Sequence, residues 1–430
     1  MAPVLGCIAD DYTGATDLSA MLVRSGMRVI QVFGARAWQR RTGESAAQSS
    51  ATVSFREVDA IVVALKSRSI PSNQAVEQSL EALRFLRQLG VQRFFFKYCS
   101  TFDSTEQGNI GPVADALADE LQAESVLFCP AFPENGRSVY RGHLFVGDQL
   151  LSDSGMRQHP LNPMTDSNLV RVLQAQSNRN VGYLPRNSLL PQSSHCRYWI
   201  ADAIEDEDLR HVAQVAGQHL FLTGGSAIAR YWAEQCWGDR LTSQRLTTQF
   251  DFSSMFSSES RAIVLAGSCS DATREQIAAF RVGYPCYEMS GDSEDVASEA
   301  NAIIRWCELQ WQPSMSPPQP LIVCSGATPA RVQAIRDRWG TDAARRVEEI
   351  FALVARQLFD RGLQRLVVAG GETAGAVIDA LEIEAIRIGP EIAPGVPWVA
   401  TLAEPRRLLV LKSGNFGDRE FFFKALEKPT

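Results

Sequence analysis

The segment Leu-Val-Val-Ala-Gly-Gly-Glu-Thr-Ala-Gly-Ala-Val-Ile-Asp-Ala-Leu occupies residues 366–381 of this 430-residue chain. An apolar run at 366–369 is typical of a buried strand, and it ends abruptly at the two glycines 370–371. A helix pattern begins at once, with Glu372 and Thr373 in its first turn. Because the first N–H groups of a helix lack internal partners and glycine permits close approach, this turn could hold a phosphate. The alternative is a tight structural turn in an α/β domain.

The same alternation of strand and helix extends over most of the chain. We expect strands at residues 4–8, 28–33, 60–65, 93–98, 125–129, 262–266, 321–324, 366–369 and 408–412. We expect helices at residues 16–24, 73–89, 112–121 and 343–361. Strand–helix alternation predicts mainly parallel sheets covered by helices. The predicted fold class is therefore α/β, with two α/β domains and an interdomain cleft, the usual place for a site that binds two substrates.

The polar segment 241–260 is rich in Ser, Thr and Gln and has no strong helix or strand pattern. We interpret it as the linker between the two domains. The predicted organisation is a first domain at 1–240, a linker at 241–260 and a second domain at 261–430.

The composition limits the class of protein. Hydrophobic residues make up 45% and charged residues 21% of the chain, as in ordinary globular proteins. The formal net charge of −7 and the isoelectric point near 5.5 exclude nucleic acid and anionic membrane as expected partners. The nine cysteines include no Cys-x-x-Cys pair, which favours free thiols in a reducing compartment. With no signal peptide and no apolar run of about 18 residues, we expect a cytoplasmic protein.

Two adjacent acids, Asp10 and Asp11, follow the first expected strand. In open α/β sheets, ligands bind at the carboxyl ends of the strands. Neighbouring carboxylates repel unless a cation, a ligand hydroxyl or N–H donors compensate them. One acid could take a proton from a sugar hydroxyl while the other orients it or holds Mg²⁺. The alternative is that these acids only cap the following helix.

A second polar segment begins at Lys97 and carries many hydroxyl groups, together with Ser100 and Asp103. Small hydroxyls and one lysine suit a carboxylated polyol. Further along, Arg137 could clamp a carboxylate through two parallel hydrogen bonds, and His143 follows it closely. The alternative is a connecting loop with Lys97 in solvent. His143 and His159 lack a third ligand at zinc spacing, and the sequence indicates no particular metal ligands.

Three loops of Gly and Ser follow strands in the second domain, around Ser268, at 370–373 and around Gly414. Several such loops at one sheet edge indicate a nucleotide more strongly than any one of them. The chain has no Walker pattern, no dinucleotide fingerprint and no protein-kinase signature. A similar glycine pair stands at 224–225, so at least one of the two pairs is structural.

The sequence resembles the four-carbon acid sugar kinase family over nearly its whole length. The resemblance rests on the ordered blocks 8–17, 97–113, 129–146, 159–171, 266–270, 370–375, 389–398 and 412–417. Cys-Ser-Thr-Phe-Asp-Ser-Thr at 99–105 is most similar to the branch that acts on 3-oxo-tetronate. The resemblance implies an amino-terminal acid-sugar-binding domain, a carboxy-terminal nucleotide-binding domain, and ATP-dependent phosphorylation of the C4 hydroxyl, with Mg²⁺.

Carried over by motif, the resemblance places the nucleotide at Ser268, Gly370, Gly371, Glu372, Thr373 and Gly414. The family's substrate side draws on Asp11, Lys97, Arg137 and His143, to which we add Asp10, Ser100 and Asp103 from their chemistry. Asp11 is the expected general base or hydroxyl-orienting group, and Asp103 is the alternative base. Tyr12, Asn162 and Ala266 replace the Phe, Thr and Ser common in the family, and none of these changes removes a charge or a required glycine.

Two alternatives remain open. The same chemistry could act on D-threonate or D-erythronate, which only kinetics would distinguish. A nicotinamide-dependent hydroxy-acid dehydrogenase would also explain the α/β domains, but the chain lacks the dinucleotide fingerprint and the ribose-binding acid that follows it. The expected partners are a small acid sugar and ATP, and a homo-oligomer is compatible with the sequence.

Overall fold

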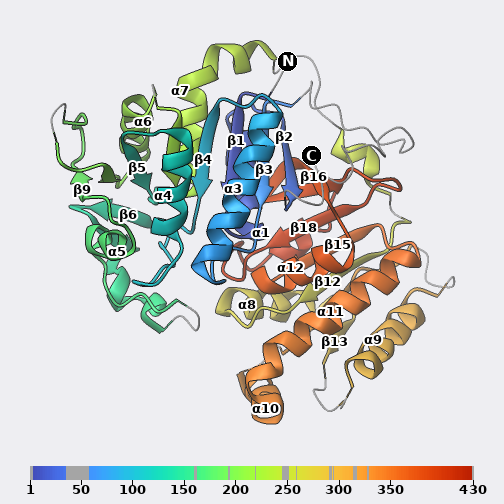
Figure 1. Ribbon diagram of the computed structural model, residues 1–430. Helices are drawn as coiled ribbons and strands as arrows, with labels where there is room; N and C mark the ends of the chain where they lie inside the picture. The colour runs from blue at the N-terminus through green and yellow to red at the C-terminus, as the bar shows by residue number, and fades with distance from the viewer. Residues whose placement is uncertain are drawn as a thin grey trace. The chain divides into compact units, whose positions relative to one another are not determined.

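The computed structural model describes residues 3–34, 58–158, 162–191, 194–217, 219–244, 251–257, 259–289, 293, 295–312, 317–326 and 329–428. Contacts divide the chain into two compact units, Met1–Thr248 and Gln249–Thr430. Each unit combines a mainly parallel sheet with helices (Figure 1). The predicted two-domain α/β class is confirmed, whereas the cleft between the domains stays a prediction.

The sheet of the first unit has the strand order β2-β3-β1-β4-β11-β5-β10-β9, and all neighbours pair in parallel. Its strands are β1 (Leu5–Ala9), β2 (Val29–Phe33), β3 (Ala60–Ala64), β4 (Arg93–Lys97), β5 (Val126–Cys129), β9 (Val181–Leu184), β10 (Tyr198–Ala201) and β11 (Phe221–Gly224). Most of these strands are buried along their whole length, as expected where helices cover both faces of a parallel sheet.

Two layers of helices belong to this unit. The helices are α1 (Tyr12–Arg24), α3 (Ser72–Gln88), α4 (Ile110–Leu121), α5 (Leu169–Gln176), α6 (Asp206–Val215) and α7 (Ser226–Gln244). In one layer α7 packs against α1 and α6, and in the other α4 packs against α3 and α5. Helices α3 and α4 lie in front of the strands in Figure 1. Because α7 continues to Gln244, helix extends beyond residue 240, where we expected the first domain to end.

A small antiparallel sheet, which the sequence analysis did not predict, follows β5. It consists of β6 (Arg137–Tyr140), β7 (His143–Val146) and β8 (Gln149–Leu150). An isolated bridge joins Val139 to Ala203. The carboxylate of Asp202 accepts the N–H groups of Arg141 and Gly142 at 2.8 and 2.9 Å. These contacts attach the small sheet to the end of β10 without adding a strand to the parallel sheet.

The second unit has the strand order β13-β14-β12-β15-β18-β17-β16. Its strands are β12 (Ala262–Ala266), β13 (Cys286–Glu288), β14 (Leu321–Cys324), β15 (Arg365–Ala369), β16 (Ala385–Ala393), β17 (Val396–Thr401) and β18 (Leu408–Lys412). Pairing is parallel from β13 to β18 and antiparallel from β18 through β17 to β16. The helices are α8 (Asp271–Phe280), α9 (Val296–Gln310), α10 (Pro329–Trp339), α11 (Ala343–Asp360), α12 (Gly371–Ala380) and α13 (Phe421–Lys424).

Each sheet contains a point where the chain connections leave in opposite directions. In the first unit β1 and β4 are neighbours, and α1 leads from β1 towards β2 while α4 leads from β4 towards β5. In the second unit β12 and β15 have the same relation, because α8 leads towards β13 and α12 towards β16. Such switch points leave a crevice at the carboxyl ends of the strands, where α/β proteins bind ligands.

The expected strands agree with the observed ones to within one residue at each end. The expected helices differ more at their starts, since α1 begins at Tyr12 and α4 at Ile110. Pro112 is therefore the third residue of α4, a position whose N–H would still lack a helical partner.

Candidate functional site

The polar cluster at the switch point of the first unit is centred on Arg68, which the sequence analysis missed. Its Nε and Nη2 donate to the two carboxylate oxygens of Asp10 at 2.9 and 2.8 Å. Nη2 also donates to Oδ1 of Asp11 at 2.5 Å, and Nη1 lies 3.7 Å from Oδ2 of Asp103. One guanidinium group thus lies within ion-pair distance of three carboxylates from the loops that follow β1 and β4.

Arg68 is held by its own loop. The backbone N–H groups of Ser67 and Arg68 donate to the Asp10 carbonyl at 2.9 and 3.2 Å. The side-chain amide of Asn109 donates to the carbonyls of Ser67 and Ile70, each at 2.8 Å. The loop after β3 is therefore fixed to the end of β1 and to the start of α4, and the guanidinium position follows from these contacts.

Asp11 caps helix α1, which is one of the two roles considered for this acid. Its Oδ2 accepts the hydroxyl of Thr13 at 2.8 Å and the N–H of Gly14 at 3.1 Å. Burial by itself would raise the pKa of Asp11, but Arg68, Lys97 and these two donors outweigh it, and the pKa is lowered. For Asp10, burial exceeds the effect of Arg68 and raises the pKa. Asp11 is therefore the more firmly ionised of the two acids.

Lys97 is buried, so the alternative that it lies in solvent is wrong. It is the last residue of β4, and its Nζ donates to the Tyr98 carbonyl at 2.9 Å. A Cβ added to Gly14 would lie 2.1 Å from Oδ1 of Asp11 and 3.0 Å from Nζ of Lys97. The ammonium and carboxylate groups thus converge on the first turn of α1, where only glycine fits.

Asp103 stands on a strained part of the backbone. The residue before it, Phe102, is fully buried and has a φ of 51°, which is unusual for a bulky residue. Its ring contacts that of Tyr98 at a centroid distance of 5.2 Å, and Oδ1 of Asp103 accepts the Thr101 hydroxyl at 2.6 Å. Ser100 is half-buried in the same loop. Such strain persists only where the surroundings impose it, which is frequent at functional sites.

Arg137 and His143 lie on the small sheet, and none of their hydrogen bonds reaches the Arg68 cluster in the described part of the chain. Arg137 donates through Nη1 to the Asn135 carbonyl, while its buried Nε has no hydrogen-bond partner within the described ranges. Nδ1 of His143 lies 2.9 Å from the Arg141 carbonyl, and Nε2 lies 3.3 Å from Nδ2 of Asn168. His159 lies outside the described residues.

In the second unit, the three Gly and Ser loops meet at the ends of neighbouring strands. Register aligns Ala266 of β12 with Ala369 of β15, and Ala369 with Lys412 of β18. The N–H groups of Gly267 and Ser268 donate to the Ala369 carbonyl at 2.9 and 3.0 Å. The structure therefore brings together the ends of β12, β15 and β18, from which all the expected nucleotide residues follow.

These loops are packed too tightly for additional side-chain atoms. A Cβ on Gly267 would lie 2.1 Å from Oγ1 of Thr373, and one on Gly414 would lie 2.3 Å from Oγ of Ser268. Gly370 precedes α12 with a φ of 131°, a conformation that favours glycine. Gly371 and Glu372 form the first turn of α12, and the Glu372 side chain is exposed. We call these three loops, which follow β12, β15 and β18, the cradle. The cradle offers backbone N–H groups and small hydroxyls.

The other glycine pair is structural. A Cβ on Gly224 would lie 2.3 Å from the Cys129 carbonyl oxygen, and one on Gly225 would lie 2.8 Å from that of Pro130. These glycines are therefore required by the close approach of the backbone that follows β5.

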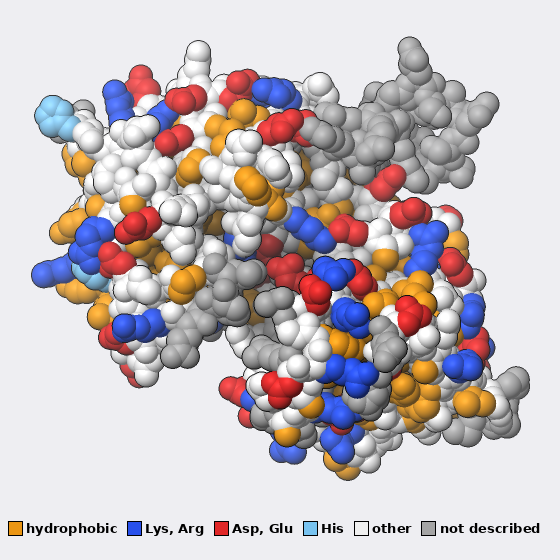
Figure 2. Space-filling model, turned by 60° about the horizontal axis from the view of Figure 1, so that its bottom comes forward, with side chains coloured by type: hydrophobic (Ala, Val, Ile, Leu, Met, Phe, Trp, Pro, Cys, Tyr) orange, Lys and Arg blue, Asp and Glu red, His pale blue; other side chains and the backbone are white. Residues whose placement is uncertain are grey.

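Further features of the described residues bear on cofactors and partners. Within them, no group of three or more His, Cys, Asp or Glu side chains is arranged to hold a metal ion. None of their helices is long and apolar enough to cross a membrane. On the face shown in Figure 2, basic and acidic side chains occur side by side.

Comparisons with known proteins match one family model to each of the two units. A family model for a sugar-binding N-terminal domain matches residues 5–232, and one for a nucleotide-binding C-terminal domain matches residues 263–422. The 3-oxo-tetronate kinases of Burkholderia multivorans and Cupriavidus necator are each 44% identical to the chain, covering 99% of it and 97% of the relative. A crystal structure from Salmonella typhimurium, described as a candidate tRNA synthase, has a TM-score of 0.82 and 37% identity over 99% of both chains.

Proposed function

Because this chain belongs to the four-carbon acid sugar kinase family, with a sugar-binding and a nucleotide-binding domain, we propose that it phosphorylates the C4 hydroxyl of 3-oxo-tetronate, using ATP. The observation that carries this proposal is the charged cluster around Arg68, which occupies the switch point of the unit matched by the sugar-binding model. We assign the acid sugar to the unit Met1–Thr248 and the nucleotide to the unit Gln249–Thr430.

In this assignment Asp11 orients the C4 hydroxyl of the acid sugar and accepts its proton. Its lowered pKa keeps it ionised at neutral pH, and phosphoryl transfer depends on positioning and charge neutralisation more than on a strong base. Asp10 stays paired with Arg68 and fixes the guanidinium next to Asp11. The proton acceptor is therefore held in place before substrate binds.

The carboxylate of the substrate requires positive charge. Lys97 supplies it from β4, and Arg137 supplies a buried Nε that has no hydrogen-bond partner among the described residues. Arginine binds carboxylates through two parallel hydrogen bonds, which suits this role. Ser100, Asp103 and His143 bring further donors and acceptors for the hydroxyl and keto groups, so that recognition depends on several directional contacts.

The nucleotide phosphates fit the loops of the second unit. The N–H groups of the first turn of α12, from Gly371 to Thr373, have the geometry and the dipole that bind phosphate at helix N-termini, whereas the N–H of Gly370 donates to the Lys412 carbonyl at 2.8 Å. Ser268 and Gly414 line the neighbouring strand ends. Mg²⁺ commonly enters such sites with the phosphates and keeps several waters, so a dedicated protein cage is not required.

The proposed compartment is the cytoplasm, where ATP is available. All nine cysteines are free thiols, which agrees with a reducing environment. Association into a homo-oligomer stays a prediction that analytical ultracentrifugation would test.

The test is to incubate the purified protein with ATP, Mg²⁺ and separate four-carbon acids and to measure ADP release, with ³¹P NMR of the product to locate the phosphate. A response to 3-oxo-tetronate with phosphate on C4 is the expected result. A response to D-threonate or D-erythronate instead would support the proposed kinase activity but show that the proposed substrate is wrong. No ADP release from a folded protein with any acid would refute the proposal.

Two other functions are not favoured by the structure. An RNA substrate, suggested by the description of the Salmonella neighbour, is opposed by the formal net charge of −7, since RNA-binding domains carry basic patches. A nicotinamide-dependent dehydrogenase would need the dinucleotide fingerprint after a strand, which the sequence lacks.

A further inference from the structure

Lys412, the last residue of β18, is fully buried in the second unit although it carries an ionisable amine. Its Nζ lies 2.8 Å from the Gly414 carbonyl, 3.1 Å from the Ser413 carbonyl and 3.1 Å from Oγ1 of Thr273. The ring of Phe421 is 5.8 Å away. All of these neighbours are neutral, and no carboxylate in the described part of the chain pairs with this ammonium group.

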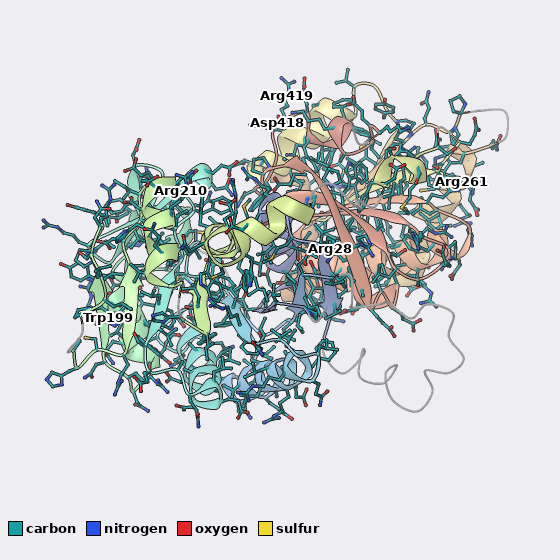
Figure 3. All side chains as sticks on the ribbon, turned by 90° about the horizontal axis from the view of Figure 1, so that it is seen from above. Arg28, Trp199, Arg210, Arg261, Asp418 and Arg419 are labelled. Carbon is teal, nitrogen blue, oxygen red and sulfur yellow. The ribbon has the colours of Figure 1, made fainter. Side chains whose placement is uncertain are left out.

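Two acids on the elements around Lys412 pair with other basic side chains. On α8, Asp271 pairs with Arg274. In the turn before α13, Asp418 (labelled in Figure 3) pairs with Lys424. Because no anion among the described residues compensates for the burial of the ammonium group, the pKa of Lys412 falls to about 7. A nearby anion would restore the charged form.

The Gly414 carbonyl is held unusually firmly. Besides Nζ of Lys412, it accepts the hydroxyls of Ser270 at 2.7 Å and Thr273 at 2.9 Å. A carbonyl oxygen has two lone pairs, so three donors fix its direction. The Gly414–Asn415 peptide is trans, and in a trans peptide the C=O and the following N–H point in opposite directions.

The N–H of Asn415 therefore points away from the Lys412 amine. No group within the described residues accepts this N–H, and Asn415 is exposed. The turn that carries it is the one whose Gly414 packs against Ser268. The N–H of Asn415 is thus an oriented donor in the turn after β18, next to the residues that we assign to nucleotide binding.

We propose that Lys412 is a positioning residue of the nucleotide site, which holds the Gly414 carbonyl so that the N–H of Asn415 faces the phosphates of ATP. This inference rests on the proposed function of the second unit. The ammonium group also adds positive charge behind the turn, and the phosphates stabilise its protonated form. Binding of ATP should therefore take up protons near and above pH 7, by linkage.

The experiment is isothermal titration calorimetry of ATP binding to the full chain, in buffers of different ionisation enthalpy, from pH 7 to 9. For the wild type we expect affinity to fall as pH rises, with proton uptake on binding. Lys412→Met should weaken ATP binding by about 10-fold or more, the loss typical of a charged hydrogen-bond group, and should flatten the pH profile. The acid-sugar KM should stay unchanged. Lys424→Met removes an exposed lysine of the same unit and should bind ATP as the wild type does.

The outcomes separate the two proposals. If a folded Lys412→Met variant keeps the affinity and the pH profile of the wild type, the positioning role is wrong, while the kinase proposal stands. If the wild type itself binds no ATP, the nucleotide assignment and this inference both fail. Should Lys412→Met not fold, Thr273→Val removes one of the three donors to Gly414, and unchanged ATP affinity in that variant would overturn the role.

Discussion

The two switch points share one strand order but carry opposite chemistry. In each unit the first four strands lie in the order second, third, first and fourth, so that β1 with β4 corresponds to β12 with β15. The first site is built from charged side chains gathered around Arg68. The second is built from glycines, small hydroxyls and backbone N–H groups, with Lys412 buried behind them.

This difference matches the ligands proposed for the two units. A four-carbon acid offers one carboxylate and a few hydroxyls, so it is recognised by charges and directional side-chain contacts. A polyphosphate offers many equivalent oxygens, which backbone N–H groups can bind at close range. Loss of a charge should therefore damage the first site most, and an added methyl group the second.

Arg68→Ala is expected to have the largest effect. It leaves the nearly buried Asp10 without its ion-pair partner, and such a loss costs about 3–5 kcal/mol of stability. Because Asp11 loses the same guanidinium, kcat/KM for the acid sugar should fall by about 10³-fold or more, equivalent to about 4 kcal/mol. Urea unfolding and ADP release measure the two effects.

A matched control is Arg28→Ala. Arg28 (Figure 3) also pairs with an aspartate through two hydrogen bonds, from Nε and Nη2 to Asp59 at 2.9 and 3.2 Å. It precedes β2, at the opposite end of the strands from the Arg68 cluster. The variant should lose stability but keep kcat; equal loss of turnover in both variants would mean that Arg68 acts only through stability.

Asp11→Asn tests the charge of the proposed proton acceptor. Asparagine caps helices as well as aspartate does, so α1 should persist, while loss of the ion pair with Arg68 should lower the stability. Turnover should fall by about 10²-fold or more if Asp11 accepts the proton. Near-normal turnover here, with a loss in Asp103→Asn, would transfer the role to Asp103.

Gly267→Ala tests the packing of the second site. The added Cβ would lie 2.1 Å from Oγ1 of Thr373, so the start of α12 must shift. Overpacking of this kind costs about 1–3 kcal/mol, and the KM for ATP should rise by about 10-fold. Gly283→Ala is the control, because nothing lies within 4 Å of its added Cβ. An ATP response that is the same in both variants would contradict the cradle.

The last prediction concerns stability alone, namely its pH dependence due to Lys412. Its pKa is lowered to about 7 in the folded chain from 10.5, so between these values the unfolded chain binds more protons. The free energy of unfolding should therefore rise with pH in this window, by at most about 1.4 kcal/mol per pH unit, and this pH dependence should vanish below the window, where the folded and unfolded chains are both protonated. Urea unfolding of the wild type and of Lys412→Met at several pH values isolates the part of the pH dependence that is due to Lys412. If the free energy of unfolding changes with pH in the same way in both proteins, the prediction is wrong.

The sequence predicted elements and loops better than it predicted contacts. Strand bounds followed from apolar runs, because parallel strands are buried on both faces. Arg68 was missed because its loop reaches Asp10 only through the pairing of β3 with β1, which no local pattern reveals. The glycine pairs at 224–225 and 370–371 have the same form in sequence. Only the carbonyl oxygens of Cys129 and Pro130 show that the first pair is filled by the protein's own backbone.

The small sheet β6–β8 has a consequence for how this protein could change over evolution. It carries Arg137 and His143 but contributes no strand to the parallel sheet of the first unit. Substitutions at its exposed positions therefore leave the parallel sheet intact, whereas Val139 and Leu144 are fully buried. A duplicated gene could acquire a new carbon-skeleton preference by remodelling this appendage, while inheriting its phosphate-handling half unaltered.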